Sequence, residues 1–195
     1  MARMSVLILP GWTNSGPEHW QSYWERAHPE YRRVEQANWD TPTRADWLPT
    51  IGSAIEQAAP PVVLVAQSLG CLAAVEWARQ ADPASLGRVA GAFLVAPVDV
   101  ERKETGAVLR KWRPISLSPL PFASIVVASR TDHYTAFARS EQFAAAWGSA
   151  LVDLGDAGHI NAASGHGPWP EGHQLLADFI AQIAIDPASQ QAGSE

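Results

Sequence analysis

The chain has 195 residues, 47% of them hydrophobic, and a formal net charge of −6 at pH 7. This length suits one domain with a sizeable core, and the acidic balance argues against nucleic acid as a partner. The single cysteine, Cys71, excludes an internal disulfide framework and is typical of a reducing compartment.

The lengths of the apolar segments also indicate where in the cell the protein is expected. The apolar run within MARMSVLILPGW is too short for the core of a signal peptide, and Pro10 and Gly11 break it. No stretch approaches the roughly 20 apolar residues that a membrane helix needs. We therefore expect a cytoplasmic protein that does not bind a membrane.

Strands and helices alternate along the first part of the chain, with apolar runs separated by residues that cap or break helices. In chain order we expect a strand at Ser5–Leu9, a helix at Glu18–Ala27, a more exposed strand at Tyr31–Glu35, a helix at Trp47–Ala58 capped by Asp46, a strand at Val62–Ala66 and a helix at Leu69–Gln80.

The alternation continues in the second part. We expect, in order, a strand at Val89–Val95, an irregular stretch at Asp99–Pro121, a strand at Ser124–Ala128, a helix near Ala136–Trp147, a strand at Ala150–Leu154 and a helix at His173–Ile185. This pattern predicts an α/β fold whose mostly parallel central sheet has helices on both faces. One domain over residues 1–186 and a frayed polar tail over 187–195 follow from it.

The segment Ala66-Gln67-Ser68-Leu69-Gly70 lies between a predicted strand and a predicted helix. Its two outer residues are small, as a nucleophile elbow requires, because strand and helix backbones approach closely there. A serine at this position is also a common helix N-cap. Ser68 is therefore a candidate nucleophile or a structural cap, and the partners available to it must decide.

A serine hydroxyl needs a histidine as general base and an acid that orients the histidine. In this architecture the three residues follow in the chain order serine, acid, histidine, each after a strand. Asp132 follows the predicted strand that ends at Ala128, and His159 lies on a glycine-bounded loop after the last strand. Asp132 and His159 are therefore the candidate acid and base.

Other residues compete for both positions. Asp99 follows the preceding strand and stays an alternative acid, whereas Asp156 is too close in sequence to the candidate histidine to be favoured. His133 is adjacent to the candidate acid and should point elsewhere. His166 shares the histidine loop and stays an alternative base on spacing alone.

Metal binding and a cysteine nucleophile are both disfavoured. His159, His166 and His173 recur every seven residues, but the intervening glycines and prolines prevent a single helix face. Their spacing matches no common zinc pattern, and we expect no metal and no cofactor. Cys71 lies one turn inside a predicted helix, where a buried packing role is expected.

An oxyanion hole requires two backbone N–H groups. One should come from Leu69, directly after the candidate nucleophile. The other should come from the loop after the first strand, where Gly11 permits unusual backbone geometry and the amide of Trp12 is the candidate.

Four segments together resemble a known family: LILPGWTNSGPEHWQSYWE, LVAQSLGC, SRTDHY and GHINAASGHGPWPEG, spread over residues 7–172. They are similar to the small α/β-hydrolases of the retinoblastoma-binding protein 9 and YdeN-like serine hydrolase family. The resemblance implies a compact α/β-hydrolase fold without a large cap domain. It also implies a triad of Ser68, Asp132 and His159, with His159 preferred to His166.

These observations favour a carboxylesterase that acts on a small-molecule acyl substrate through an acyl-enzyme. A peptidase, amidase or thioesterase would use the same triad, and a scaffold protein on the hydrolase fold is a further alternative. Trp12, Trp112 and Trp169 are candidates for the substrate pocket or the core. No exposed apolar repeat indicates a protein interface.

The irregular stretch also carries a group of basic residues. They are Arg102, Lys103, Arg110, Lys111 and Arg113. They could meet an anionic substrate, but a solvated surface loop is the favoured interpretation.

Overall fold

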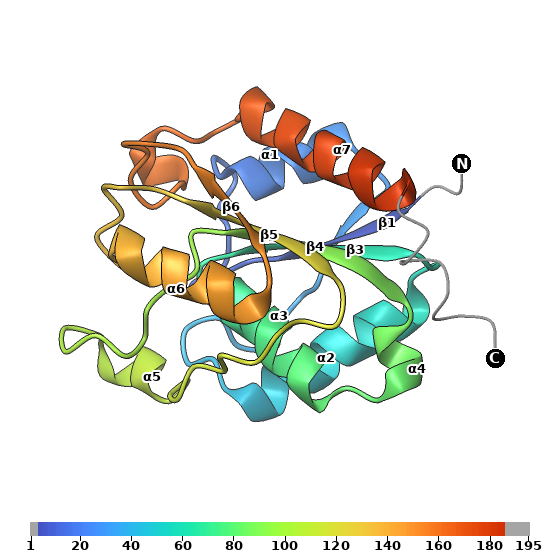
Figure 1. The fold of residues 1–195 in the computed structure, drawn as a ribbon, viewed down its shortest axis with the longest axis horizontal. Helices are drawn as coiled ribbons and strands as arrows, with labels where there is room; N and C mark the ends of the chain where they lie inside the picture. Colours follow the sequence, from blue (N-terminus) through green and yellow to red (C-terminus); the bar gives the residue numbers. More distant parts are fainter. Residues whose placement is uncertain (1–3, 186–195) are drawn as a thin grey trace.

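The computed structural model describes residues 4–185, which form one six-stranded parallel sheet between two layers of helices (Figure 1). The strand order is β2-β1-β3-β4-β5-β6. The strands are β1 (Ser5–Leu9), β2 (Tyr31–Arg33), β3 (Val62–Gln67), β4 (Val89–Val95), β5 (Ala123–Ala128) and β6 (Ala150–Asp153). The tail expected over residues 187–195 lies outside the described residues.

Helices cover both faces of this sheet, as the sequence predicts. Helices α1 and α7 lie on one face, and α2, α3 and α6 lie on the other (Figure 1). The helices are α1 (Trp20–Ala27), α2 (Arg44–Gln57), α3 (Leu69–Gln80), α4 (Pro83–Leu86), α5 (Ala107–Arg110), α6 (Phe137–Trp147) and α7 (Pro170–Ile185), with a 3₁₀ turn η1 (Ala162–Ser164).

Strand β3 shows how the sequence builds this arrangement. All of its residues are buried, because the strand lies inside the sheet and is covered on both sides. Val63 and Val65 pack toward α1 and α7, whereas Leu64 and Ala66 pack toward α2 and α3. Side chains alternate across a strand, so a continuous apolar run supplies two separate cores.

The predicted boundaries need several corrections. Helix α2 starts at Arg44, and its cap is Thr43, whose hydroxyl accepts the N–H of Asp46; the predicted cap, Asp46, is in the first turn. Helix α7 starts at Pro170, because proline is well suited to the first helical position. The stretch expected to be irregular contains the short helix α5, and the sequence did not indicate α4.

The chain crosses from strand to strand without an inserted cap domain within residues 4–185. Because all strand pairs are parallel, their carboxyl ends meet at one edge of the sheet. The loops that follow β1, β3, β5 and β6 therefore converge. No helix in this part of the chain has the length and apolarity to cross a bilayer.

Candidate active site

Ser68 occupies the sharp transition between β3 and α3. Its backbone has φ 54° and ψ −119°, a conformation that L-residues rarely adopt and that costs about 1–3 kcal/mol. The residue precedes the first turn of α3, but its side chain makes no capping hydrogen bond. A simple N-cap role therefore does not explain Ser68, and the surrounding structure must hold the strained geometry.

Two glycines allow the backbones around Ser68 to approach closely. A Cβ on Gly70 would lie 2.2 Å from the carbonyl oxygen of Leu9, so α3 sits directly against the end of β1. A Cβ on Gly11 would lie 2.9 Å from Cβ of Ser68. The loop after β1 is therefore packed against the candidate nucleophile, as the elbow pattern predicts.

His159 connects the two other candidate residues. Its Nε2 lies 3.0 Å from Oγ of Ser68, and its Nδ1 lies 2.8 Å from Oδ2 of Asp132. A carboxylate only accepts hydrogen bonds, so Nδ1 carries the proton and Nε2 is free to accept the serine hydroxyl proton. This is the arrangement that a general base requires.

The carboxylate of Asp132 is itself held on both oxygens. Its Oδ1 accepts the backbone N–H of Tyr134 at 2.8 Å, while Oδ2 faces His159. The side chains of Asp132 and His159 are 3% and 6% exposed. Water is therefore largely excluded from the hydrogen bond that orients the imidazole.

The loops that carry acid and histidine are joined by two hydroxyl groups that the sequence analysis did not identify. Ser129 Oγ accepts the N–H of Ala157 at 3.0 Å and contacts the carbonyl oxygen of Gly155 at 3.2 Å. Thr131 Oγ1 accepts the N–H of Gly158 at 3.1 Å. The only sequence signal was two hydroxyl residues directly after a buried strand.

The histidine loop is also anchored from the opposite side. Trp20 Nε1 donates to the carbonyl oxygen of Ile160 at 2.9 Å, and Trp24 Nε1 donates to that of Pro168 at 2.9 Å. Both indoles belong to α1 and pack in the aromatic cluster beneath the loop. Trp20 and Trp24 therefore have a structural role, because they hold the backbone of the histidine loop.

The alternative acids and bases are engaged elsewhere. Asp99 lies 3.7 Å from the guanidinium of Arg139, and its N–H donates to Thr135 Oγ1. His166 Nδ1 lies 3.1 Å from Ser164 Oγ, and burial lowers the pKa of His166 below its usual value. Neither residue has a hydrogen bond to the group that it would need to serve.

The remaining candidates for base, acid and nucleophile are His133, Asp156 and Cys71. They differ in their distance from the triad. The ring of His133 lies 6.1 Å from that of His159, centroid to centroid, with no hydrogen bond between them. Asp156 makes no side-chain hydrogen bond to His159 within residues 4–185. Cys71 is buried, its Sγ lies 3.4 Å from the carbonyl oxygen of Val95, and burial raises the pKa of its thiol.

The predicted oxyanion donors are the residue after Ser68 and the residue after Gly11, whose added Cβ would lie 2.9 Å from Cβ of Ser68. The backbone hydrogen bonds of residues 4–185 include none donated by the N–H of Trp12 or of Leu69. Trp12 is fixed by its indole, whose Nε1 donates to the carbonyl oxygen of Asp40 at 2.9 Å. Thr13 and Asn14, which follow it, both have positive φ.

His19 is a buried polar residue near this site that the sequence analysis did not single out. It caps α1, and its Nδ1 accepts the N–H of Gln21 at 3.2 Å. Burial, with the positive charge of Arg33 nearby, lowers the pKa of His19 to about 3. His19 is therefore neutral near pH 7, with its proton on Nε2. Histidine is not a common cap, so its position gave no signal.

The three tryptophans predicted as pocket candidates lie in different surroundings. Trp12 is 39% exposed and follows Gly11, which packs against Ser68. Trp169 is mostly buried, yet it lines an open cavity of about 550 Å³ beside the histidine loop. Trp112 is 1% exposed and packs edge-on against Trp47 in the core, which is the second of the two surroundings expected for it.

The basic residues of the 99–121 stretch bond largely to the protein itself. Arg113 donates to the carbonyl oxygens of Val100 and Arg102, and Arg110 donates to that of Thr105. Arg102 also donates to the carbonyl oxygen of His133, which ties this stretch to the acid loop. These contacts agree with a surface loop.

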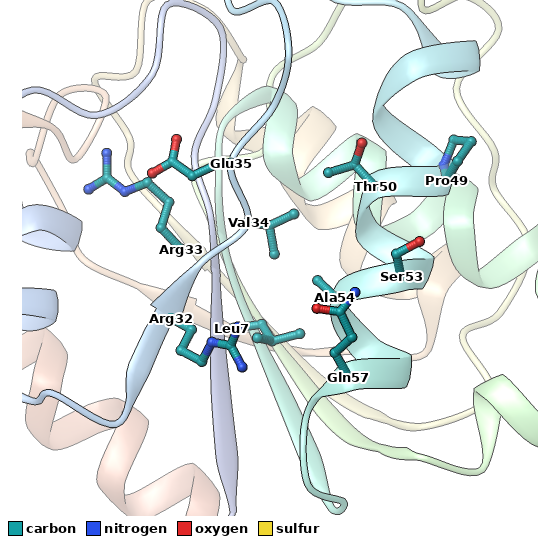
Figure 2. Close-up of a pocket in the computed structure, with 10 residues that line it drawn as sticks. All are labelled: Leu7, Arg32, Arg33, Val34, Glu35, Pro49, Thr50, Ser53, Ala54 and Gln57. Atoms are coloured by element: carbon teal, nitrogen blue, oxygen red, sulfur yellow. The ribbon is translucent and has the colours of Figure 1, made fainter.

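Within residues 4–185 no cluster of three or more His, Cys, Asp or Glu side chains could hold a metal ion. A separate cavity of about 420 Å³ lies between the end of β2 and α2 (Figure 2). The residues that line this cavity include Arg32, Glu35 and Gln57. They do not include Ser68, Asp132 or His159.

Comparisons with known proteins agree with this architecture. A family model described as serine hydrolase matches residues 6–178. A protein described as a YdeN-like hydrolase, from Pectobacterium atrosepticum, is 36% identical, with 93% of this chain and 92% of that chain covered and a TM-score of 0.81. No relative among the curated proteins matches.

Two more distant structures share the fold. The ydeN gene product of B. subtilis is 19% identical, with 92% of this chain and 100% of that chain covered and a TM-score of 0.74. Esterase 2 of Thermogutta terrifontis, in a structure phosphonylated by cyclosarin, is 17% identical, with 95% and 84% covered and a TM-score of 0.67.

Proposed function

Because this chain belongs to the serine hydrolase family, and is similar to its YdeN-like members, we propose that it hydrolyses a small carboxylic ester through Ser68, His159 and Asp132. The observation that carries the proposal is the continuous hydrogen-bond chain from Ser68 Oγ through the imidazole to Asp132 Oδ2. Three residues from three separate loops form it, and a scaffold would not need all three.

The first half of the reaction forms an acyl-enzyme. Ser68 Oγ attacks the ester carbonyl carbon while His159 Nε2 takes the hydroxyl proton. Asp132 holds the imidazole by Nδ1 and stabilises the imidazolium that forms. The tetrahedral intermediate then collapses: its bond to the alcohol oxygen breaks, and His159 returns the proton to the departing alcohol.

The second half releases the acid. Water loses a proton to His159 and attacks the acyl carbon, and collapse of this second intermediate returns the proton to Ser68 Oγ. In both halves the carbonyl oxygen carries a negative charge. We assign its binding to the N–H groups of Leu69, which follows Ser68, and of Trp12, which follows Gly11. A well-aimed donor of this kind is worth about 3 kcal/mol.

Several features support a small substrate and no cofactor. The described residues 4–185 carry no inserted cap domain over the triad loops, and the proposed chemistry needs only the side chains and amides named above. A small-molecule acyl ester in the cytoplasm is the proposed setting. An amide or a thioester would use the same triad, so substrate assays accompany the labelling test.

The decisive experiment is covalent labelling with a fluorophosphonate probe, read as intact mass. We expect one adduct on the wild-type protein and none on Ser68→Ala, with Ser118→Ala, at an exposed serine on another loop, as a control that keeps the label. Failure of the folded wild-type protein to label would contradict the proposal. Hydrolysis of p-nitrophenyl acetate faster than of p-nitroacetanilide would then favour an esterase over an amidase.

A further inference from the structure

Tyr134 is an exposed aromatic residue that lies directly against the candidate general base. Its ring centroid is 4.5 Å from that of His159, at an interplanar angle of 56°. The residue is 39% exposed, and its hydroxyl makes no hydrogen bond within residues 4–185. An exposed aromatic ring beside the candidate base offers a flat apolar surface against which a substrate group can pack.

The backbone of Tyr134 is fixed although its ring is exposed. Its N–H donates to Oδ1 of Asp132 at 2.8 Å, and the ring of the neighbouring His133 lies 4.1 Å away, centroid to centroid. Arg102 holds the carbonyl oxygen of His133 from the far side. The aromatic surface is therefore presented in a defined place, at small entropic loss on binding.

The chemistry of ester cleavage says which part of a substrate passes this surface. His159 must give its proton to the oxygen of the departing alcohol, so that oxygen lies within hydrogen-bond distance of Nε2. The group attached to that oxygen then extends from beside the imidazole. The ring of Tyr134 packs against the imidazole, whereas the proposed oxyanion donor Trp12 follows Gly11, which packs against Ser68.

We propose that Tyr134 is the leaving-group contact of this enzyme and that it favours esters of aromatic alcohols. The inference rests on the proposed function, since it assumes that His159 protonates the alcohol. A flat ring on the alcohol side stacks or packs edge-on against Tyr134, as aromatic pairs prefer. The hydroxyl of Tyr134 is not required for this contact.

The test uses three acetate esters that differ only in the alcohol: ethyl acetate, benzyl acetate and cyclohexylmethyl acetate. All three form the same acetyl-enzyme, so a difference in kcat/KM reports the acylation step and therefore the alcohol. We expect the wild-type enzyme to prefer benzyl acetate to the other two. Tyr134→Ala should lower kcat/KM for benzyl acetate about fivefold and leave that for ethyl acetate within about twofold.

Two further variants distinguish the aromatic ring of Tyr134 from its hydroxyl and from the loss of any exposed apolar side chain. Tyr134→Phe keeps the ring and should retain the preference for benzyl acetate. Leu117→Ala removes another exposed apolar side chain, 48% exposed and on a different loop, and should change none of the three rates. Fluorophosphonate labelling of Ser68 in each variant shows whether the triad itself still works.

The outcomes distinguish this inference from the proposed function. An enzyme that labels at Ser68 and hydrolyses all three acetates without preference, or whose Tyr134→Ala variant loses all three equally, overturns the assignment of Tyr134 and leaves the hydrolase proposal intact. A loss confined to benzyl acetate supports it. A wild-type protein that neither labels nor hydrolyses any of the esters overturns both.

Discussion

Ser68 Oγ and His159 Nε2 lie 3.0 Å apart although 91 residues separate them in the chain. A second contact ties the same two segments: Gln67, the neighbour of Ser68, donates from Nε2 to the carbonyl oxygen of His159 at 3.3 Å. The histidine is therefore held through its backbone as well as its ring. This double attachment suits a base that must stay aimed at one hydroxyl through both halves of a reaction.

Replacement of the two loop histidines should have very different effects. His159→Ala removes the group that takes the serine proton and should lower kcat at least about 10⁴-fold. His166→Ala removes a side chain that contacts Ser164 instead, and most activity should remain. Steady-state ester hydrolysis measures both. The opposite ranking would move the role of base to His166.

The two candidate acids can be compared in the same way. In Asp132→Asn the amide nitrogen can donate to Nδ1 of the histidine, which places the ring proton on Nε2 and prevents it from accepting from Ser68. A fall in kcat of about 10⁴-fold is expected. Asp99→Asn weakens only a contact with Arg139 and should reduce kcat less than about threefold. A greater loss with Asp99→Asn would place the acid after β4.

The close approach of α3 to β1 predicts a strong effect of a single methyl group. In Gly70→Ala the new Cβ would meet backbone oxygens of Leu9 at 2.2 Å and Pro10 at 2.7 Å, which cannot rotate away. We expect a loss of about 3 kcal/mol or more in the free energy of unfolding, measured in urea.

Gly16→Ala is the matched control for that change, because no atom lies within 4 Å of its added Cβ and it belongs to the loop after β1. Its unfolding free energy should stay within about 0.5 kcal/mol of the wild-type value. Equal stability of Gly70→Ala and Gly16→Ala would mean that the elbow is looser than the structure indicates.

The lowered pKa of His19 predicts that the free energy of unfolding decreases at acidic pH. Burial and Arg33 lower its pKa to about 3 from 6.5, so between these values the unfolded chain binds a proton that the folded protein lacks. Stability is therefore lost as the pH falls below 6.5, by up to about 1.4 kcal/mol per pH unit. His19→Asn keeps a capping side chain without titrating and should flatten this part of the curve.

Urea unfolding of both proteins at pH 7, 6, 5 and 4 measures the difference. Other groups titrate in both proteins, so the informative quantity is the difference in unfolding free energy between wild type and His19→Asn at each pH. This difference should shrink or change sign toward pH 4. Parallel curves over this range would show that His19 has an ordinary pKa in the folded protein.

Much of the fold follows directly from local sequence. The strands Ser5–Leu9 and Val89–Val95 and the helix Leu69–Gln80 have the predicted limits, because apolar runs end there at residues that break or turn the chain. Helix starts were less certain. At α2 both Thr43 and Asp46 are good caps, and the structure uses Thr43, with the hydroxyl and the carboxylate bonded to each other.

The sequence by itself determined the order of the strands and of the longer helices, the two apolar faces of the strands and a short set of polar candidates at strand ends. Spacing alone left Asp99 and His166 as alternatives, and the family resemblance favoured Asp132 and His159. The tertiary structure brings Asp132 and His159 into hydrogen-bonding distance of their partners and leaves Asp99 and His166 bonded elsewhere. The preference of a segment for helix or strand depends on residues near it in the sequence, and therefore it can be predicted from the sequence. Contacts across 91 and 27 residues depend on how loops are anchored, here by Ser129, Thr131 and the indoles of α1, and no local pattern encodes those distances.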